Sequence, residues 1–555
     1  MRPMNSEQDL PHLAHEAELD EADDLDDLDE ADEFSGADAP VPSERPSKLE
    51  EAAVKMARWM SKMGPTRPEI IRAVPAHYAL QQVGRVFWTR RLAAWQDKAT
   101  VAERIDEFWS HSWQLRPWRK ILTLLVIKNG VPAAVIGSLV ASASCLLCIL
   151  GLLPVGDAEP PLGPMYHPAK GLWCLGTGFA AHLVTLFCWR PRSSIFLDRI
   201  CIQQNDARLQ QEGVLSIGAF LKTSEGMLVL WDATYVQRLW CMFEVAAFLK
   251  SRPEDDTHAR LSIVPTHLGP LCMVILFIIP SAFIFAWILL AYGSTGGWQL
   301  LMVVPIIILP FAIYAISEAR TYMRSVRTLQ EQLNTYSLLD SRCSCCDHGH
   351  VMRGQPIPCD RLVIGRCIES WFGGVEAFEN AVRRTVLPTF TEKFGHHLIP
   401  ISSFLASTVT IWWGCLDFFA GFALTEQNHR PVEGHSLWWL ITGFGVWLGA
   451  LPTCCVCVLF LVRKLLMSRG CILDIFRFIL LFALATLALC AMLGLGLVVI
   501  DIAGKVFGPA PGLPVLASIS SSLQILIALV TWNAHRLRRW TARDAGDRGA
   551  KGSRA

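Results

Sequence analysis

Long runs of apolar residues alternate with polar segments along the 555-residue chain. A helix needs about 20 consecutive apolar residues to cross a bilayer, and its backbone groups must then be paired within the segment. The runs therefore predict about eight transmembrane helices. We place these spans at residues 131–155, 171–188, 268–292, 298–316, 398–424, 437–461, 476–500 and 513–532.

Two of the polar segments, 105–129 and 193–267, have the pattern of an α/β fold. Strands that alternate with helices predict a parallel sheet covered by helices. Two spans lie between the segments and return the chain to the side that it left, so we expect the segments to form one sheet. The strands are predicted at 105–110, 194–198, 227–231 and 261–265, and the helices at 117–128, 207–222 and 235–250.

Lys and Arg residues cluster at one set of span ends, while the opposite loops contain only Lys170, Arg430 and Lys505. Cytoplasmic loops carry the excess of Lys and Arg, so both termini and all large polar segments are predicted to lie in the cytosol. The basic ends contain Arg116, Arg119, Lys120, Arg190, Arg192, Lys250, Arg252, Arg260, Arg320, Arg324, Arg327, Arg463, Lys464, Arg469, Arg536, Arg538 and Arg539.

The composition agrees with an integral membrane protein, since 52% of the residues are hydrophobic and only 18% are charged. None of the 18 cysteines falls in a predicted far-side loop, so a disulfide framework is not indicated. Residues 1–33 contain 14 acidic residues and one basic residue, which is typical of a disordered tail. The C-terminal tail is basic, and its expected partner beside a membrane is anionic lipid, not nucleic acid.

These features divide the chain into soluble and membrane-embedded parts that alternate. The predicted parts are an acidic disordered tail (1–50), a cytosolic helical segment (51–104), the first part of the α/β domain (105–130), a transmembrane hairpin (131–189), the second part of the α/β domain (190–267), a second transmembrane hairpin (268–317), a cytosolic Cys-containing helical segment (318–395), a four-span bundle (396–535) and a basic cytosolic tail (536–555).

The two α/β segments resemble the Toll/interleukin-1-receptor (TIR) domain family. "DEFWSHSWQLRPWRK" is similar to the first strand and its loop, and "IFLDRICIQQND" to the second. "TSEGMLVLWDATYVQRLWCMFEVAAF" follows the family pattern of a Ser, a strand, a short loop and Trp-Cys-x-x-Glu on a helix. "LDRICIQQND" also resembles the related heterokaryon-incompatibility domains. The resemblance implies a flavodoxin-like parallel sheet, although Arg238 stands where plant members usually place Ser.

The resemblance implies one enzymatic and one non-enzymatic role. Some members hydrolyse NAD with a Glu that matches Glu244, and Trp240 beside it would support a stacked ring. Ser110, His111 and Asp198 would then lie at the carboxyl ends of strands, where α/β sheets bind ligands. Other members are adaptors that self-associate. In that case Glu244 is an ordinary helix residue or salt-bridge partner, and the other side chains serve loops and caps.

Two further groups of residues are candidates for metal binding or for function inside the spans. "CSCCDHGH" at 343–350, with Cys359 and Cys367, contains zinc-type ligands, but it lacks paired C-x-x-C spacing. We therefore favour a reduced cytosolic loop without a metal, and metal binding and acylation stay as alternatives. Asp417 and His182 are ionisable groups inside spans, which marks them for function by default, although Asp417 is expected close to the far interface.

The favoured interpretation is a membrane-embedded signalling or scaffold protein. Its cytosolic TIR-like domain would form homo-oligomers and, as in some relatives, use NAD as a substrate, and no bound cofactor is indicated. The alternative is a channel or transporter with a regulatory insert of this kind. A third interpretation is a membrane protein whose TIR-like fold is purely structural.

Overall fold

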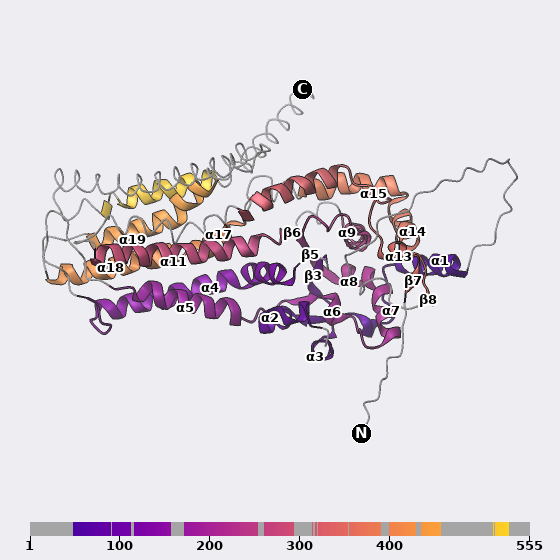
Figure 1. Ribbon diagram of the computed structural model, residues 1–555, viewed down its shortest axis with the longest axis horizontal. Coiled ribbons are helices and arrows are strands. Elements are labelled where there is room, and N and C mark those ends of the chain that lie inside the picture. Colours follow the sequence, from indigo (N-terminus) through magenta and orange to yellow (C-terminus); the bar gives the residue numbers. More distant parts are fainter. Residues whose placement is uncertain are drawn as a thin grey trace, which may run out of the picture.

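The molecule is elongated, with an α/β region at one end and a bundle of helices at the other (Figure 1). We call residues 48–116, 190–267 and 320–389 the α/β region, and the apolar helices the helical region. The computed structural model describes residues 48–89, 92–112, 116–156, 171–253, 260–292, 320–352, 355–389, 399–428, 435–456 and 517–531, together with residues 314, 317, 318, 514 and 515.

A six-stranded sheet with the order β2-β1-β4-β3-β5-β6 forms the centre of the α/β region. β3 pairs in parallel with β4 on one side and with β5 on the other, so that Glu107 lies opposite both Ile195 and Gly226. β5 pairs in parallel with β6. The segments before and after the first helical hairpin therefore do form one sheet. Its strands are β1 (Arg72–Pro75), β2 (Thr100–Val101), β3 (Ile105–His111), β4 (Ser194–Phe196), β5 (Ser224–Trp231) and β6 (Leu261–Pro265).

The sheet is mixed, which corrects the prediction of a purely parallel one. β1 pairs antiparallel with β4, and the two-residue β2 pairs antiparallel with β1. Residues 51–104, predicted to be helical, thus supply two strands at one edge. β1 has only four residues and ends in Pro75, so its sequence gives no periodic signal, and proline is tolerated at such a strand end.

Helices α8 and α9 pack against each other and against β3, and so cover one face of the sheet. Phe196 on β4 is 2% exposed, and its ring lies 4.5 Å from that of Phe108 and 4.3 Å from that of Phe220. α14 packs on α9, and α1 packs on α14. The helices of this region are α1 (Lys48–Met60), α2 (Ala76–Gly84), α3 (Ala93–Gln96), α6 (Asp198–Cys201), α7 (Ala207–Leu215), α8 (Ile217–Thr223), α9 (Leu239–Lys250), α13 (Ser344–Asp347), α14 (Asp360–Phe372) and α15 (Val375–Ala381), with 3-10 turns η1 (Pro68–Ile70) and η2 (Arg85–Phe87), a π-helical turn η3 (Val382–Val386) and the hairpin β7 (Val351–Met352) and β8 (Gln355–Pro356).

Two helices of the helical region, α4 and α11, follow directly after strands of the sheet. α4 runs without interruption from the loop after β3 through most of the predicted span 131–155, and it ends at Ile149, although Pro132 lies inside it. α11 begins at Leu268, three residues after β6 ends. The helices of this region are α4 (Pro117–Ile149), α5 (Trp173–Cys188), α11 (Leu268–Tyr292), α17 (Ile401–Thr408), α18 (Thr410–Asn428), α19 (His435–Gly445) and the π-helical turn η5 (Val446–Ala450).

Three stretches are long and apolar enough to cross a membrane: Pro117–Ile149, Ile401–Glu426 and Ser436–Val456. Trp173–Cys188, Leu268–Ser281 and Ala517–Thr531 are shorter apolar helices within the described residues. The predicted spans 298–316 and 476–500 fall almost wholly outside the described part of the chain. Among the described residues, three helices meet the length and hydropathy of a membrane span, so the eight predicted spans are shown only in part.

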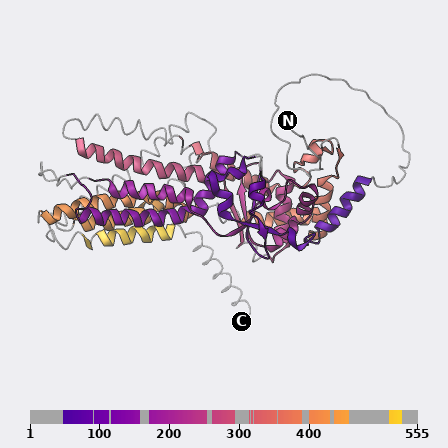
Figure 2. The same cartoon turned by 90° about the horizontal axis from the view of Figure 1, so that it is seen from below.

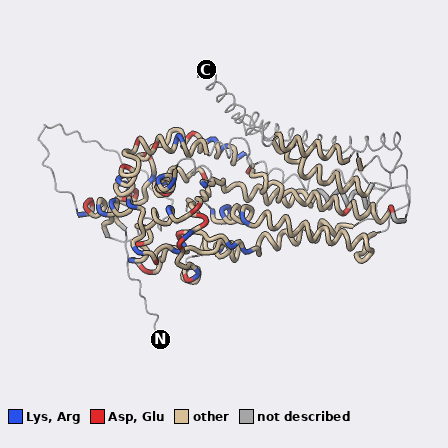
Figure 3. The backbone as a smooth tube through the Cα atoms, turned by 180° about the vertical axis from the view of Figure 1, so that it is seen from behind, with Lys and Arg blue, Asp and Glu red and all other residues tan. Residues whose placement is uncertain are grey.

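The helical region carries large apolar side chains on its outside. Leu139 and Leu146 on α4, and Val184 on α5, are each more than half exposed. Figures 1 and 2 show the helices of this region lying side by side along the long axis. Figure 3 shows that Lys, Arg, Asp and Glu gather in the α/β region and are sparse along the bundle.

Small residues lie where these helices touch. Trp413 on α18 is fully buried, and a Cβ atom at Gly137 or Gly178 would approach its ring to 2.7 or 2.9 Å. Its Nε1 donates a hydrogen bond to Ser138 Oγ at 3.1 Å. Close approach at glycine is the usual packing of helices in membranes.

Polar side chains join the two regions where α4 and α11 leave the sheet. Arg119 Nη2 donates to Glu318 Oε1 at 2.8 Å, and His267 Nδ1 lies 2.8 Å from Glu318 Oε2. Burial alone would raise the pKa of Glu318, but the hydrogen bond from His267 and the charge of Arg119 lower it overall. These contacts link the start of α4 to the residue before α11 through Glu318.

Candidate functional site

Three side chains form a hydrogen-bonded chain at the carboxyl end of β3. The hydroxyl of Ser110, on β3, donates to Oε2 of Glu244 on α9. Ser110 Oγ also lies 2.6 Å from the hydroxyl of Tyr235, which stands in the turn between β5 and α9. Either hydroxyl can donate in this second contact, and the Tyr235 hydroxyl also lies 3.4 Å from Cys241 O. Carboxyl ends of parallel strands are where α/β sheets bind ligands.

Local sequence explains how these groups meet. β3 is buried at both Phe108 and Trp109, and Ser110 follows them with only 1% of its surface exposed. α9 is buried along most of its length, and Glu244 lies in its second turn with its side chain directed back to β3. The carboxylate therefore lies between the helix and the strand end, and it is half-buried.

The environment of Glu244 favours its neutral form. Burial raises the pKa of Glu244 to about 8, the charge of Asp198 adds to the rise, and the hydrogen bond from Ser110 and the charge of Arg238 oppose it. A carboxyl group with a pKa near 8 holds its proton through most of the neutral range. A cation placed beside it would favour the carboxylate and release that proton.

The other site residues predicted from the sequence are distributed around this centre. Asp198 is the first residue of α6, where its Oδ1 accepts the backbone N–H of Arg199 at 2.7 Å. His111 is 6% exposed, and its ring meets that of Phe87 edge to face at 5.7 Å. Asp198 thus acts on Glu244 through its charge, while His111 packs against an aromatic ring.

Trp240 faces away from the carboxylate. Its Nε1 donates to Asp360 Oδ2 at 3.0 Å, and its ring packs edge to face on Phe243 at 5.5 Å. Phe243 in turn stacks on Trp371 of α14. Trp240 therefore links α9 to α14, and the structure does not place it over Glu244 as a stacking platform.

Sequence reasoning missed Tyr235 because it placed residues 235–250 in one helix. α9 begins four residues later, at Leu239, and leaves Tyr235 in a turn where it is 2% exposed. Asp232 shapes that turn, because its Oδ1 accepts from the backbone N–H and the hydroxyl of Thr234 at 3.0 and 2.7 Å. The Asp-x-Thr spacing after a buried strand was the available signal.

Asp417 and His182, the ionisable groups predicted inside the spans, make contacts that stabilise the packing of helices. Asp417 on α18 accepts hydrogen bonds from the backbone N–H groups of Cys174 and Leu175 at 2.8 and 2.9 Å. These donors belong to the first turn of α5, where a helix has no partners of its own. Asp417 therefore caps α5 from a neighbouring helix. His182 is 2% exposed and lies edge to face with Trp413 at 5.8 Å.

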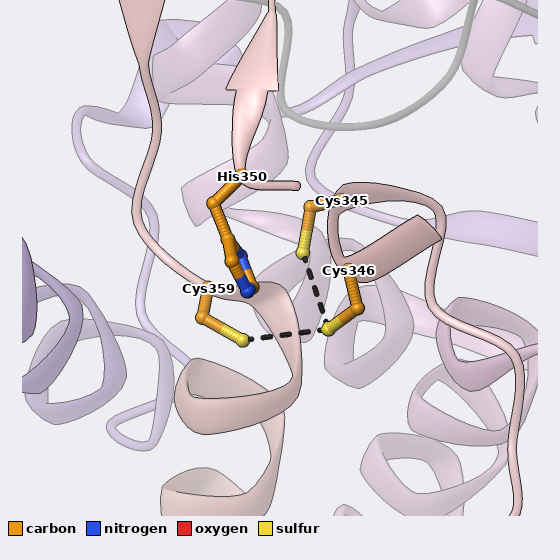
Figure 4. A group of neighbouring side chains, drawn as sticks. All are labelled: Cys345, Cys346, His350 and Cys359. Carbon is orange, nitrogen blue, oxygen red and sulfur yellow. Dashed lines mark hydrogen bonds between the residues drawn. The ribbon is translucent and has the colours of Figure 1, made fainter. Parts of the chain in front are cut away.

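A second group of side chains meets in the segment before α14, and we call Cys345, Cys346, His350 and Cys359 the thiol–imidazole cluster. Its four ligand atoms lie within 4.8 Å of one another (Figure 4). Cys345 is buried and the other three are half-buried. Cys343, Cys345 and Asp360 form an overlapping group. These residues were expected to form a loop, and the structure instead folds them around a common centre.

The molecule therefore presents two chemically distinct centres. The chain of Ser110, Tyr235 and Glu244 can place a carboxylate beside a developing positive charge at the strand ends. The thiol–imidazole cluster offers soft ligands for a metal ion. No protein-family model, no curated protein and no solved structure matches the chain.

Proposed function

We propose that the chain is a multi-pass membrane protein with both termini in the cytosol, whose TIR-like α/β domain signals by self-association. The observation that carries the proposal is the single sheet formed by β3, from before the first helical hairpin, and β4–β6, from after it. Both ends of that hairpin must lie on the same side of any membrane that it enters. The sheet would therefore stand on one face of the bilayer, anchored by α4 and α11.

The outer surface of the helical region supports the membrane assignment. In the most apolar window of Pro117–Ile149, only 33% of the residues are buried inside the protein. Soluble proteins rarely expose large continuous apolar surfaces, because water makes them unfavourable. Lipid would cover these side chains, and the polar junction of Arg119, His267 and Glu318 would lie at the cytosolic interface.

The order of the parallel strands supports the TIR-like assignment. Numbered along the chain, the four parallel strands β3 to β6 lie in the order 2-1-3-4, as in flavodoxin-like sheets. The antiparallel β1 is an addition at the edge. Glu244 then lies beside the carboxyl ends of the central strands, where the resemblance implies it should be.

A second function, hydrolysis of NAD, is favoured by the contact between Ser110 and Glu244. In this reaction the bond between ribose C1′ and the nicotinamide nitrogen breaks, and its electron pair leaves with nicotinamide. Positive charge develops on the ribose, water adds to C1′, and one proton is released. Glu244 would stabilise that charge as a carboxylate, and the cationic nicotinamide ring would favour the ionised form.

The surroundings of Asp417 argue against the transport alternative. A residue on a transport path needs oxygens free to bind a solute, but both oxygens of Asp417 accept backbone hydrogen bonds from α5. The side chain is also 8% exposed. Its position fits a fixed helix cap between two packed helices.

The enzymatic part is tested by nicotinamide release from NAD by the full chain in detergent or nanodiscs. We expect turnover that Glu244→Gln abolishes and that Glu225→Gln, a change on β5 at an exposed ion pair with Arg104, leaves intact. Equal turnover in both variants, or none in the wild type, would remove the hydrolase and leave the scaffold proposal.

The scaffold part is tested in nanodiscs for assembly and in sealed vesicles for topology. Light scattering of the full chain in nanodiscs should give more than one chain per particle at micromolar concentration. Protease digestion of sealed vesicles should cut residues 320–389 and both tails from the same side. Monomers at every concentration would overturn self-association, and cuts from opposite sides would overturn the topology.

A further inference from the structure

We propose that the thiol–imidazole cluster is a structural zinc site, with Cys345, Cys346, Cys359 and His350 as its four ligands. Three thiolates and one imidazole are a common ligand set for structural zinc, which is four-coordinate and tetrahedral. The ligands come from three short pieces of chain: α13, the turn before β7, and the residue that precedes α14. A site closed by four protein ligands leaves no position for a substrate, so its role is structural.

The sulfur positions match a tetrahedron around zinc. Zn–S bonds of about 2.3 Å place two sulfurs about 3.8 Å apart at the tetrahedral angle. Cys345 Sγ and Cys346 Sγ are 4.0 Å apart, and Cys346 Sγ and Cys359 Sγ are 3.7 Å apart. A disulfide would need about 2.05 Å between sulfurs. The thiols are thus at metal-ligand spacing and not at bonding distance.

His350 completes the set through an unusual backbone conformation. Gly349 and His350 both have positive φ, +62° and +59°, which a histidine adopts at a cost. In this turn the His350 backbone makes two hydrogen bonds. Its N–H donates to Cys345 O at 2.8 Å, and its carbonyl accepts from the Ile357 N–H at 2.9 Å. Figure 4 shows the imidazole pointing in among the three sulfurs. Within the described residues, the buried His350 Nδ1 has no hydrogen-bond partner.

Surrounding groups support thiolates at this centre. The backbone N–H of Asp360 donates to Cys345 Sγ at 3.2 Å, a contact that favours the anionic form of the sulfur. Cys343 Sγ, fully enclosed at 1% exposure, lies 3.2 Å from Cys345 Sγ and can donate its S–H to it. We assign Cys343 to this supporting role, because His350 already supplies the fourth ligand.

Zinc at this site would fix the start of α14, and through it the position of α9. Asp360, next to Cys359, accepts the indole N–H of Trp240, and Lys250 at the end of α9 donates to Trp371 O at 2.9 Å. The segment before the cluster also bonds to the residues before α9, where Arg342 N–H donates to Gln237 O at 2.6 Å. The metal would thus hold the helix that carries Glu244 without touching Glu244 itself.

The experiment measures metal in the full chain, purified in detergent under reducing conditions. Mass spectrometry of metal content should find about one zinc per chain. Cys346→Ser, Cys359→Ser and His350→Ala should each lose most of it. Cys188→Ser, at an exposed thiol on α5, and Cys367→Ala, at a buried thiol on α14 outside the cluster, should keep it.

Two readouts keep the proposal falsifiable if a ligand variant fails to fold. Zinc-edge X-ray absorption of the wild type should show three sulfurs at about 2.3 Å and one nitrogen at about 2.0 Å. Cobalt exchanged into the wild type should give the visible bands of a tetrahedral thiolate site. No bound zinc, a four-sulfur shell, or full zinc retention in a folded His350→Ala or Cys359→Ser variant would overturn the assignment.

Discussion

The α/β region and the helical region place similar apolar side chains in opposite positions. In the α/β region the large residues lie inside, as do Phe196 and Phe220, both at most 2% exposed. In the helical region Leu139 is 66% exposed, while small residues such as Gly178 and Ala141 lie between the helices. Burial from water organises the first region, and close helix packing organises the second. The difference is the one expected from the proposed membrane assignment, with water around the sheet and lipid around the bundle.

The largest expected effect comes from the core of the α/β region. Phe196→Ala should reduce the free energy of unfolding by about 3–5 kcal/mol, because it removes a ring enclosed by Phe108 and Phe220. Chemical denaturation in detergent measures this. Phe187→Ala, on the outside of α5 at 41% exposure, is the matched control and should change little. Equal losses of unfolding free energy in the two variants would show that buried and outward-facing aromatic rings contribute alike in the two regions.

The next effect tests close packing in the helical region. Gly178→Val should destabilise the bundle by about 1–3 kcal/mol, since a Cβ there would lie 2.9 Å from both Ala141 and Trp413. Gly176→Ala, on the same helix in open space, should be tolerated. Thermal unfolding in one detergent compares them. If Gly178→Val is as stable as Gly176→Ala, the helices do not depend on close approach.

A smaller effect depends on pH and belongs to the α/β region alone. The folded state keeps the Glu244 proton up to a pKa of about 8, whereas an unfolded chain releases it at a typical Glu pKa. The folded state therefore binds more protons between these values, and its stability falls as pH rises through this window. Glu244→Gln should flatten this part of the profile, and Glu225→Gln should not. An unchanged slope in Glu244→Gln would show that the carboxyl is already ionised.

The smallest effect concerns the cap on α5. Asp417→Ala should cost about 1 kcal/mol, because two N–H groups in the first turn lose their acceptor. Asp417→Asn retains one acceptor oxygen and should cost less. Thermal unfolding separates the two variants. If both variants leave stability unchanged but alter ion or solute flux equally, Asp417 serves transport and not capping.

Some of the fold could be predicted from the sequence because the signals are local. The predicted strand 261–265 coincides with β6. The segment 318–395, predicted to be helical, contains α14 and α15, and Gly373 follows α14 at a φ of +81°. The pairing of 105–129 with 193–267 followed from counting two spans between them. β1 could not be predicted in this way, because four residues carry no period and their partner β4 is more than a hundred residues away.

The candidate sites likewise depend on contacts between distant residues, which local sequence patterns do not specify. The resemblance singled out Glu244, and its pattern also placed Ser110 at a strand end, but their hydrogen bond required the sheet. Trp240 lies one turn before Glu244 on the same side of α9. Its indole nevertheless turns to Asp360, because α14 packs on α9 and supplies that acceptor. Cys345, Cys346, His350 and Cys359 have irregular spacing along the chain, so their meeting became visible only in three dimensions.

By itself the sequence determined where the chain is apolar, where it is charged, and which short segments form strands and helices, since these depend on nearest neighbours and on the period of each element. Only the tertiary structure decided that the sheet is mixed, that Tyr235 joins Ser110 and Glu244, that Asp417 caps α5, and that four metal-type ligands share one centre. Each of these depends on residues distant in the chain or on a turn whose course the local pattern does not specify. A one-dimensional pattern cannot record contacts that packing alone creates.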